Sequence, residues 1–555
     1  MSDSSSSSYR RSGRLSFVPA RYDEEQLSLQ LQRQDERELD RALQESLDLD
    51  DDSDTDNDIS PLLIESESEE EEKKEPIVPQ EKEWTTAIHN ITPRPFSTPF
   101  GPVGLRRSHT SPLDFFQLFL STSLVHHIAN CTNEYASSKN VVDWAPTNTS
   151  EIYWFTGLLI YMGINRLPQL PMYWSSLYSH SFVSNAVSRD RFKQFLRCFH
   201  VSTQAEQQQN TDRLKKIRWF SQELQQQFSS HYIPSQVLTV DEAMVGFKGR
   251  SELKQYIPQK PTKWGFKVWC LASRNYLLNF EIFEGKSASS VVRSPTDVVL
   301  SLTSPYQHRS HIVYLDRLFT SPQLLDELAT RGIHSCGTVR KDRIGLPPTY
   351  KTIAKDMNQG EMKHWQRGEL GAIVWKDRRA VYLLSTYKSP IETTFVSRSG
   401  SSVQTAVPTA VLDYNKYKGG VDTIDQMRES YSIGRKSQKW WPSLVWWLID
   451  MCILNAYSLY NQQQQVKIRQ LEFRQQLMQQ LVEIYGQQRS NIGRPSSISQ
   501  QKQQQQHWPL RTNKERDCAY CSHEPDSRKQ SRIQCELCHV HLCIDPCFKL
   551  FHTQH

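Results

Sequence analysis

The chain of 555 residues lacks two kinds of apolar segment. No apolar run follows a basic stretch near its start, so we expect no secretory signal peptide. No long hydrophobic run is free of polar residues either, because the most apolar stretch, residues 440–460, contains Pro442, Asp450 and Asn455. We interpret this stretch as a buried helix rather than a membrane span, and we expect no membrane partner.

Negative charge is concentrated in one segment. Residues 48–75 hold 14 acidic residues against two lysines, a local net charge of −12, so the rest of the chain carries +17 within a total of +5. A basic body favours a polyanionic partner, although an acidic run can equally be a solvated face that keeps the protein soluble. The first 82 residues are also poor in aromatics and rich in Ser and Gln, which predicts disorder. Within them, residues 25–50 faintly resemble a ubiquitin-binding helix, and a transient amphipathic helix is the simpler interpretation.

Cysteine is sparse until the last forty residues. Five of the 11 cysteines are scattered, and we expect these to pack in the core. The other six form three pairs followed by two histidines: Cys518, Cys521, Cys535, Cys538, Cys543, Cys547, His552 and His555. Their spacing in a chain without a secretory signal favours two structural Zn²⁺ ions over disulfides.

We expect these ligand pairs to interleave, with the first and third pairs on one ion and the second and fourth on the other. Because a terminal His555 could fray, His523, His539 and His541 are alternative eighth ligands. Taken alone, such a segment also fits a protein-binding RING-like or PHD-like module.

The middle of the chain changes its periodicity. Apolar residues recur at helical spacing from about 95 to 235, and short segments rich in β-branched and aromatic residues follow from about 236. Several strands, then strands alternating with helices such as SPQLLDELATRGI, predict an α/β fold with helices packed on a mixed sheet.

Three aspartates stand where strand-like segments or helix starts would expose them, and a fourth follows the third on the same helix. Asp241 follows an apolar strand in LTVDEAMV, and Asp316 ends HIVYLD. Asp422 opens a helix after a Gly pair, and Asp425 lies one turn later on the same side. Each alone is typical of a helix cap or a surface charge. Together they suit phosphodiester chemistry with two Mg²⁺ or Mn²⁺ ions about 3.5–4 Å apart.

A family resemblance adds specificity to this pattern. The segments TVDEAMVGFKGR, KPTKWGFKVWCLA, YLDRLFTS, CGTVRKDR and YNKYKGGVDTIDQM resemble, in order and spacing, the DDD transposases of the piggyBac superfamily. GLLIYMGINRLPQLPMYWSS and KWWPSLVWWLIDMCILNAY belong to the same resemblance, which covers residues 112–460 and the cysteine tail. It implies an RNase H-like catalytic core, interrupted by an insertion and flanked by a helical domain.

The implied domain boundaries are as follows: a disordered acidic N-terminal region at 1–94, a helical dimerisation and DNA-binding domain at 95–235 and 428–490, the RNase H-like core at 236–345 and 407–427, the insertion at 346–406, a Gln-rich linker at 491–515 and a zinc-binding domain at 516–555.

The resemblance also implies roles for individual residues. Asp241, Asp316 and Asp422 would hold the catalytic metal ions, with Asp425 as the accompanying carboxylate. Arg317 stands where the family usually has Asn. A guanidinium there could pair with Asp316, repel a cation or contact substrate phosphate. Six basic residues are candidate DNA-phosphate contacts, although each could be a plain surface cation: Arg250, Lys260, Lys263, Lys267, Arg340 and Lys341.

Two functional hypotheses result. The first is a nuclear, homodimeric DNA transposase that cuts double-stranded DNA at transposon ends through hairpin intermediates and joins those ends to TTAA targets. The second is a domesticated, catalytically inactive DNA- or chromatin-binding protein, favoured by Arg317 and the acidic arm. A third, a zinc-module adaptor in ubiquitin pathways, leaves the middle of the chain unexplained.

Overall fold

The computed structural model describes residues 83–175, 178, 181–209, 212–258, 260–285, 293–397, 404–486, 507–523 and 529–553. The chain divides into two compact units, residues 1–486 and 487–555. The possible ubiquitin-binding helix, the acidic segment and most of the Gln-rich linker lie outside the described residues.

The first unit begins with helices, as the helical periodicity predicts. Ser or Asn side chains cap several of them; Ser111, for example, forms a reciprocal capping box with Asp114 at the start of the first helix. The helices before the sheet are α2 (Pro112–Phe116), α3 (Thr122–Ser138), α4 (Thr149–Ile164), α5 (Ser181–Ser184), α6 (Arg189–Cys198), α7 (Gln204–Gln209) and α8 (Arg218–Ser230), with a 3₁₀ turn at Leu170–Trp174.

Nine strands form one mixed sheet in the part of the chain that the structure describes. Their order is β4-β5-β3-β7-β8-β11-β10-β9, and β6 also pairs with β5. These strands are β3 (Val237–Gly246), β4 (Gln255–Tyr256), β5 (Trp264–Ser273), β6 (Tyr276–Ile282), β7 (Ile312–Leu315), β8 (His334–Thr338), β9 (Met362–Arg367), β10 (Leu370–Lys376) and β11 (Ala380–Ser385). β3, β5 and β6 pair antiparallel, whereas β7 runs parallel to β3 and β8 runs parallel to β7. The fold is therefore mixed α/β, as the sequence indicated.

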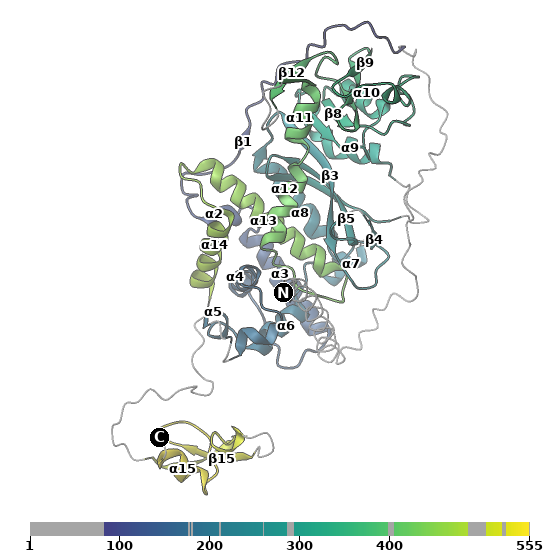
Figure 1. Ribbon diagram of the computed structural model, residues 1–555. Coiled ribbons are helices and arrows are strands. Elements are labelled where there is room, and N and C mark those ends of the chain that lie inside the picture. The colour runs from purple at the N-terminus through teal and green to yellow at the C-terminus, as the bar shows by residue number, and fades with distance from the viewer. Residues whose placement is uncertain are drawn as a thin grey trace, which may run out of the picture. The chain divides into compact units, whose positions relative to one another are not determined.

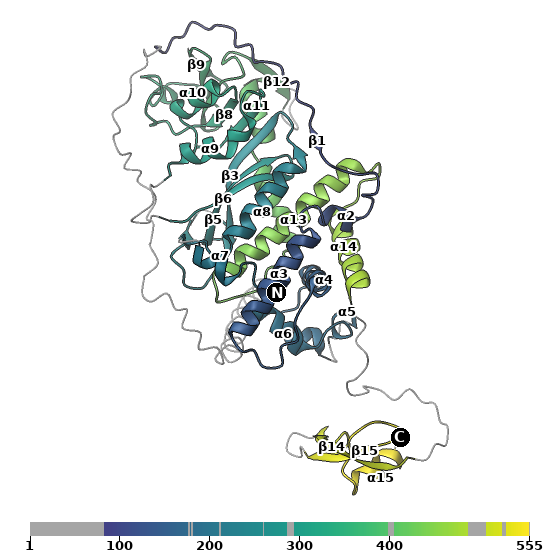
Figure 2. The same cartoon turned by 180° about the vertical axis from the view of Figure 1, so that it is seen from behind.

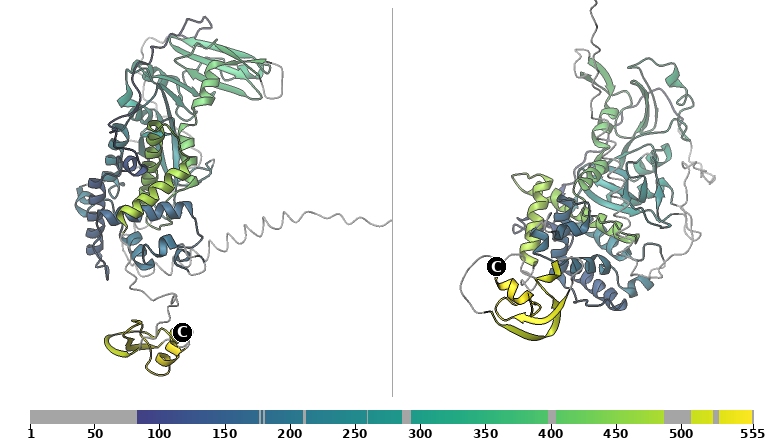
Figure 3. Two further views of the ribbon diagram at one scale, coloured as in Figure 1. Left: turned by 90° about the vertical axis from the view of Figure 1, so that its left-hand side faces the viewer. Right: turned by 60° about the horizontal axis from the view of Figure 1, so that its bottom comes forward.

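The segment expected as an insertion continues this sheet. β11 pairs antiparallel with β8, so β11, β10 and β9 extend the sheet toward one end of the unit (Figure 3). A separate antiparallel pair, β12 (Thr393–Ser397) and β13 (Gln404–Pro408), completes the segment. Strands β9 and β12 and helices α10 (Pro322–Thr330) and α11 (Thr409–Tyr417) gather at that end, away from α3–α6 (Figure 1).

The start of the described chain contacts this extension. Thr85 forms an antiparallel bridge with Gln366 of β9, and the Trp84 indole donates a hydrogen bond to the Gly345 carbonyl at 2.9 Å. Residues 83–94 were expected within the disordered N-terminal region, so that boundary was placed too late. The edge strand β9 has unpaired backbone groups with which Thr85 can pair. The sequence pattern of residues 83–94 alone does not predict this pairing.

The apolar stretch at 440–460 forms the central helix, α13 (Trp441–Gln463). Its length and composition would allow it to cross a membrane, yet 78% of its most apolar window is buried inside the protein. It packs beside α8 and the strand β6 (Figure 2), and it also contacts β3 and α14 (Gln470–Tyr485). Its polar residue Asp450 pairs with Arg474 of α14 at 3.1 Å, and both side chains are fully buried. The remaining elements of this unit are β1 (Gly101–Pro102), β2 (Tyr232–Ile233), α9 (Pro295–Thr303), α12 (Gly420–Ser430) and 3₁₀ turns at Ser304–Tyr306 and Ile353–Lys355.

The second unit is small. An antiparallel pair, β14 (Pro509–Asp517) and β15 (Gln530–Cys535), is followed by α15 (Cys547–Thr553), with a 3₁₀ turn at Cys521–His523. Its apolar core centres on Leu542 and two cysteines, Cys518 and Cys547. So small a core would not hold these elements in place by apolar burial alone.

Candidate active site and metal centres

The parallel pairing of β3 and β7 places two of the candidate aspartates side by side. Val240 of β3 is paired with Leu315, the last residue of β7. Asp241 follows Val240 within β3, and Asp316 directly follows β7. Neighbouring residues on a strand point to opposite faces, and Val240 and Leu315 both belong to the main apolar core. Asp241 and Asp316 therefore lie on the other face, at adjacent strand positions.

The third aspartate is brought to this face by α12. The Thr239 hydroxyl donates a hydrogen bond to the Tyr417 carbonyl at 3.1 Å, just before the helix begins. A Cβ on Gly420 would lie 2.9 Å from Thr239 Oγ1, so only glycine lets the helix start so close to β3. Asp422 follows in the first turn of α12. Gly420 thus has a packing reason in addition to the DNA approach that the sequence suggested, whereas a Cβ on Gly419 would have no atom within 4 Å.

The carboxylates influence one another's protonation. Burial, together with the negative charges of Glu242 and Asp316, raises the pKa of Asp241 to about 7. Burial and Glu242 also raise the pKa of Asp316. One helical turn beyond Asp422, burial and the charges of Glu429 and Asp422 raise the pKa of Asp425 to about 6. A group of acids that resist ionisation in this way favours a cation between them.

The cation that the structure places there is Lys260. Its Nζ donates a hydrogen bond to the Glu242 carbonyl at 3.0 Å and lies 3.5 Å from Glu242 Oε1. The charge of Lys260 also lowers the pKa of Asp241. In turn, the charges of Glu242, Asp241 and Asp422 raise the pKa of Lys260. Lys260 was predicted as a DNA-phosphate contact, but its ammonium faces the carboxylates instead. Neither Lys260 nor Glu242 was identified as part of this site, because only the β3–β5 pairing folds residue 260 back over β3.

The aspartates differ in how closely they approach one another. Some groups of three or more potential metal ligands among the described residues have all their ligand atoms within 4.8 Å of one another. Asp241, Asp316 and Asp422 do not form such a group. Their donor set, carboxylate oxygens with unfavourable mutual charge, fits Mg²⁺ or Mn²⁺. Sharing an ion would require the three side chains to close around it.

Arg317 does not pair with its neighbour. Asp316 Oδ1 instead accepts a hydrogen bond from the Leu318 backbone N–H at 2.8 Å. The Arg317 side chain is exposed. The sequence left three roles open for Arg317, and the structure does not show the first of them, an ion pair with Asp316. Repulsion of a cation and contact with substrate phosphate stay open.

The other basic candidates lie on the surface or near it. Arg250, Lys263, Arg340 and Lys341 are exposed. Lys267 is half-buried, with its Nζ 5.5 Å from the centre of the Trp269 ring. Arg340 also lies near Asp342, with Nε 3.5 Å from Oδ1. The exposed four are therefore the candidates available to an external phosphate.

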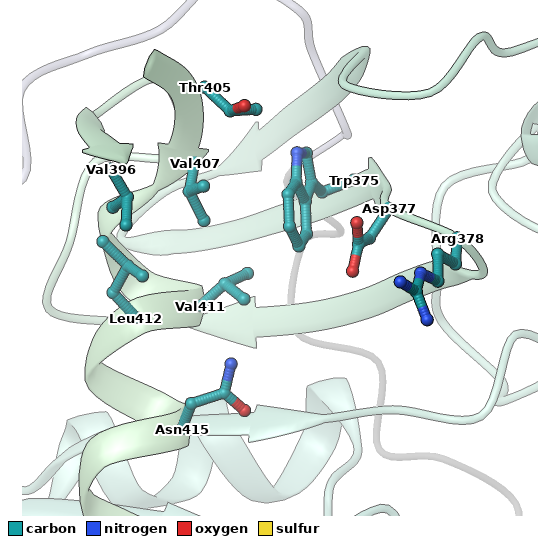
Figure 4. Close-up of a pocket in the computed structure, with 9 residues that line it drawn as sticks. All are labelled: Trp375, Asp377, Arg378, Val396, Thr405, Val407, Val411, Leu412 and Asn415. Atoms are coloured by element: carbon teal, nitrogen blue, oxygen red, sulfur yellow. The ribbon is translucent and has the colours of Figure 1, made fainter. Parts of the chain in front are cut away.

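A pocket of about 420 Å³ lies at the far end of the sheet, and none of the aspartates lines it (Figure 4). Trp375 of β10 forms one wall, the β12–β13 pair contributes Val396 and Val407, and α11 closes the other side with Val411 and Asn415. The pocket has no acid–base group in common with the carboxylate site.

The second unit contains two ligand clusters. Cys518, Cys521, Cys543 and Cys547 form one group whose sulfur atoms lie within 4.8 Å of one another, and the other consists of His507, Cys535, Cys538 and His552. The first cluster joins the first and third sequence pairs, and the second contains the second pair with His552. Both groups are donor sets that could hold a tetrahedral metal ion.

The eighth ligand position differs from every candidate that the sequence offered. His507 Nδ1 lies 3.2 Å from Cys538 Sγ and 3.5 Å from Cys535 Sγ. His539 is exposed, and His541 Nδ1 lies 2.9 Å from the Ser531 carbonyl. His555 lies outside the described residues, as does the side chain of His523. His507 escaped notice because it ends a Gln-rich run. It reaches the cysteines because β14 pairs with β15: Pro509 lies opposite Cys535, and the Glu536 backbone N–H donates to the Trp508 carbonyl.

Comparisons with known proteins identify the family of this chain. A family model described as Transposase IS4 matches residues 111–457. Among proteins of Homo sapiens, PiggyBac transposable element-derived protein 3 is 28% identical over 466 residues, which cover 80% of this chain and 76% of that protein. PiggyBac transposable element-derived protein 2 is 27% identical over 445 residues, covering 75% and 73%. A cryo-EM structure of a piggyBac transposase synaptic complex with hairpin DNA is similar with a TM-score of 0.64 at 25% identity, over 72% of this chain and 85% of that one.

Proposed function

Because this chain belongs to the Transposase IS4 family, in its piggyBac type, we propose that it is a DNA transposase whose active site is built by Asp241, Asp316 and Asp422. The observation that carries the proposal is the convergence of these residues on one face of the sheet. They are separated by 75 and 106 positions in the sequence, yet Asp241 and Asp316 occupy adjacent strand positions, and α12 starts against β3.

The strand order supports an RNase H-like core for this site. Three antiparallel strands, β6-β5-β3, are followed by β7 and β8, both parallel to β3. Asp241 within β3 and Asp316 directly after β7 then lie near a helix that adds a third carboxylate. On this proposal β9–β11 are an extension of the core, placed between the second and third aspartates.

The reaction proposed is in-line attack at phosphorus by water or a DNA 3′-hydroxyl, which cuts transposon ends through hairpins and joins them to TTAA targets. Two divalent ions, Mg²⁺ or Mn²⁺, would activate the attacking oxygen and stabilise the leaving one when bound. Asp241, Asp316 and Asp422 would hold them. Asp425, 3.7 Å from the Arg428 guanidinium, would keep the first turns of α12 in position.

DNA binding would use the exposed cations Arg250, Lys263, Arg340 and Lys341, which contact phosphates without reading sequence. We propose that the two clusters of the second unit hold structural Zn²⁺ ions. The helical segments that precede and follow the core in the sequence, residues 95–235 and 428–490, would form the contact between the two chains of a homodimer. An enzyme acting on chromosomal DNA would work in the nucleus.

A second candidate function is DNA binding without catalysis, which two observations favour. Lys260 already supplies positive charge among Glu242, Asp241 and Asp422. Arg317 adds an exposed guanidinium directly after Asp316. Lys260 would compete with divalent metal for the carboxylates, and Arg317 could add to that competition only by turning toward them.

The deciding experiment is strand cleavage of a DNA that carries the gene's own flanking ends, with Mg²⁺ or Mn²⁺. Wild type would be compared with Asp316→Ala, Arg317→Asn and the control Asp190→Ala, which removes an exposed aspartate of α6. Metal-dependent nicking by wild type and Asp190→Ala, lost in Asp316→Ala, would support the transposase. Cleavage by Arg317→Asn alone would support the inactive DNA-binding protein.

A further inference from the structure

Three potential metal ligands meet in the helical part of the first unit, far in sequence from the carboxylate site and from the cysteine tail. His127 and Cys131 stand one turn apart on α3, and Glu206 belongs to α7. One ligand atom from each lies within 4.8 Å of the other two. Residues four apart on a helix share a face, so His127 and Cys131 present their side chains together.

The separations match a metal coordination shell. Cys131 Sγ lies 3.2 Å from His127 Nε2, and the same nitrogen lies 3.3 Å from Glu206 Oε1. Zinc bonds to nitrogen, oxygen and sulfur are about 2.0–2.3 Å long, so ligand atoms at tetrahedral angles are about 3.3–3.6 Å apart. The three side chains are therefore already close to the spacing of first-shell ligands.

Hydrogen bonds satisfy these three groups only in part. A neutral His127 carries either one proton or one lone pair at Nε2, yet a thiol and a carboxylate both converge on that atom. If Nε2–H donates to Glu206, the Cys131 sulfur can share that proton only as a weak acceptor. A cation among the three atoms would accept a lone pair from each of them.

The surroundings hold the ligands in place. The His127 ring packs on the Trp219 ring with their centres 3.9 Å apart. Glu206 uses its other oxygen, Oε2, to accept from the Thr203 backbone N–H at 2.8 Å, which leaves Oε1 toward His127. Glu134 of α3 accepts from the Gln204 backbone N–H at 2.9 Å and so fixes the start of α7 against α3. The ligand geometry is thus prepared by contacts outside the site.

From this arrangement we propose a third metal site, in which His127, Cys131 and Glu206 bind one Zn²⁺ ion. A thiolate, an imidazole and a carboxylate are borderline ligands that suit zinc, and the charges of thiolate and carboxylate balance the ion. Binding forms the sulfur–zinc bond as the Cys131 S–H bond breaks and its proton passes to water. His127 and Glu206 side chains are 25% and 22% exposed, so water can reach the fourth position.

The site would act as a clamp between α3 and α7. Glu206 is the ligand that α7 contributes, and this helix has no buried residue of its own. The ion would therefore fix a short helix that apolar packing does not hold. This role is independent of the proposed transposase activity.

The test is the zinc content of the purified full-length protein, measured by mass spectrometry after exhaustive dialysis against a weak chelator. Wild type would be compared with Cys131→Ser and with Glu206→Gln, which keeps the shape of the side chain. Cys198→Ser is the matched control, since Cys198 is an equally buried thiol on the neighbouring α6. Cobalt substitution adds a second readout, because a thiolate bound to Co²⁺ absorbs in the near ultraviolet.

We expect wild type and Cys198→Ser to hold one more zinc ion per chain than Cys131→Ser. Glu206→Gln should lose that ion at a chelator concentration at least about tenfold lower than wild type requires, with an unchanged circular dichroism spectrum. The difference spectrum of the cobalt proteins, wild type minus Cys131→Ser, should show one thiolate–cobalt band. Equal zinc content in wild type, Cys131→Ser and Glu206→Gln would overturn the proposal, as would the same loss in Cys198→Ser.

Discussion

The hydroxyl of Thr239 on β3 donates a hydrogen bond to the carbonyl of Tyr417 at 3.1 Å, and this bond joins the sheet to the start of α12. The oxygen of the same hydroxyl would lie only 2.9 Å from a Cβ on residue 420. One threonine therefore sets both the position of the helix and the need for glycine at its first residue. The placement of Asp422 relative to Asp241 depends on this contact.

Substituting Gly420→Ala should therefore displace α12. We expect a loss of about 1–3 kcal/mol in the free energy of unfolding, because the added methyl group overlaps Thr239 Oγ1. Gly419→Ala is the control, since a Cβ there has no atom within 4 Å. Thermal and urea unfolding of the two variants would measure the difference. Equal stability of both would show that α12 is not seated on Thr239.

Replacing Lys260 tests whether it neutralises the carboxylates. Lys260→Met leaves Glu242, whose side chain is 12% exposed, without its ion pair, so we expect a loss of about 1–3 kcal/mol in the absence of divalent ions. Added Mg²⁺ should raise the melting temperature of this variant more than that of wild type. Lys263→Met removes an exposed lysine and should change stability by less than about 0.5 kcal/mol. An identical response to Mg²⁺ in all three proteins would contradict this role.

The buried pair of Asp450 and Arg474 should be sensitive to the loss of one partner. Asp450 also accepts hydrogen bonds from the Ser432 hydroxyl at 3.0 Å and the Ile433 backbone N–H at 3.1 Å. Asp450→Ala would leave the Arg474 guanidinium buried without its counter-charge, at a cost of about 3–5 kcal/mol. The double variant Asp450→Leu with Arg474→Met should recover part of that loss. Chemical denaturation of the single and double variants measures the coupling, and no recovery would show that the hydrogen bonds dominate.

His507 should be required for the fold of the second unit. In the presence of zinc, His507→Ala should weaken retention of one metal ion and increase proteolysis of residues 507–553, because this small core depends on metal for its stability. His539→Ala, at an exposed position outside both clusters, should leave metal content and proteolysis unchanged. A zinc chelator should reproduce the effect of His507→Ala. If His539→Ala loses metal and His507→Ala does not, the ligand assignment is wrong.

Stability should fall in mild acid because of His200. This residue is buried, its ring stacks on Tyr135 with centres 3.7 Å apart, and burial lowers its pKa to about 3. The unfolded chain binds a proton near pH 6.5 and the folded chain does not, so folding loses free energy as the pH falls below 6.5. Between pH 6.5 and 5 this single group should cost about 1.6 kcal/mol. Urea unfolding of wild type and His200→Gln across this range should show a shallower dependence in the variant; parallel curves would exclude His200 as the cause.

Local pattern was enough to predict much of this protein. Short β-branched segments became β3, β5, β7 and β8, the apolar stretch at 440–460 became a buried helix, and spacing paired the cysteines as the first cluster has them. These features depend on residues close in sequence, where periodicity and ligand spacing act directly. The resemblance to piggyBac transposases was confirmed because its motifs keep their order along most of the chain.

Contacts between distant segments were decided only by the tertiary structure. Lys260 reaches Glu242 because β5 folds back on β3, and His507 reaches Cys538 because Trp508 pairs with Glu536. The cluster of His127, Cys131 and Glu206 needs α7 to lie on α3, a packing that no local pattern specifies. The sequence by itself determined which segments form helices, strands and ligand pairs, because propensity and periodicity are local. The fold decided which charges and ligands meet, because that depends on strand register and helix packing between residues far apart in the chain.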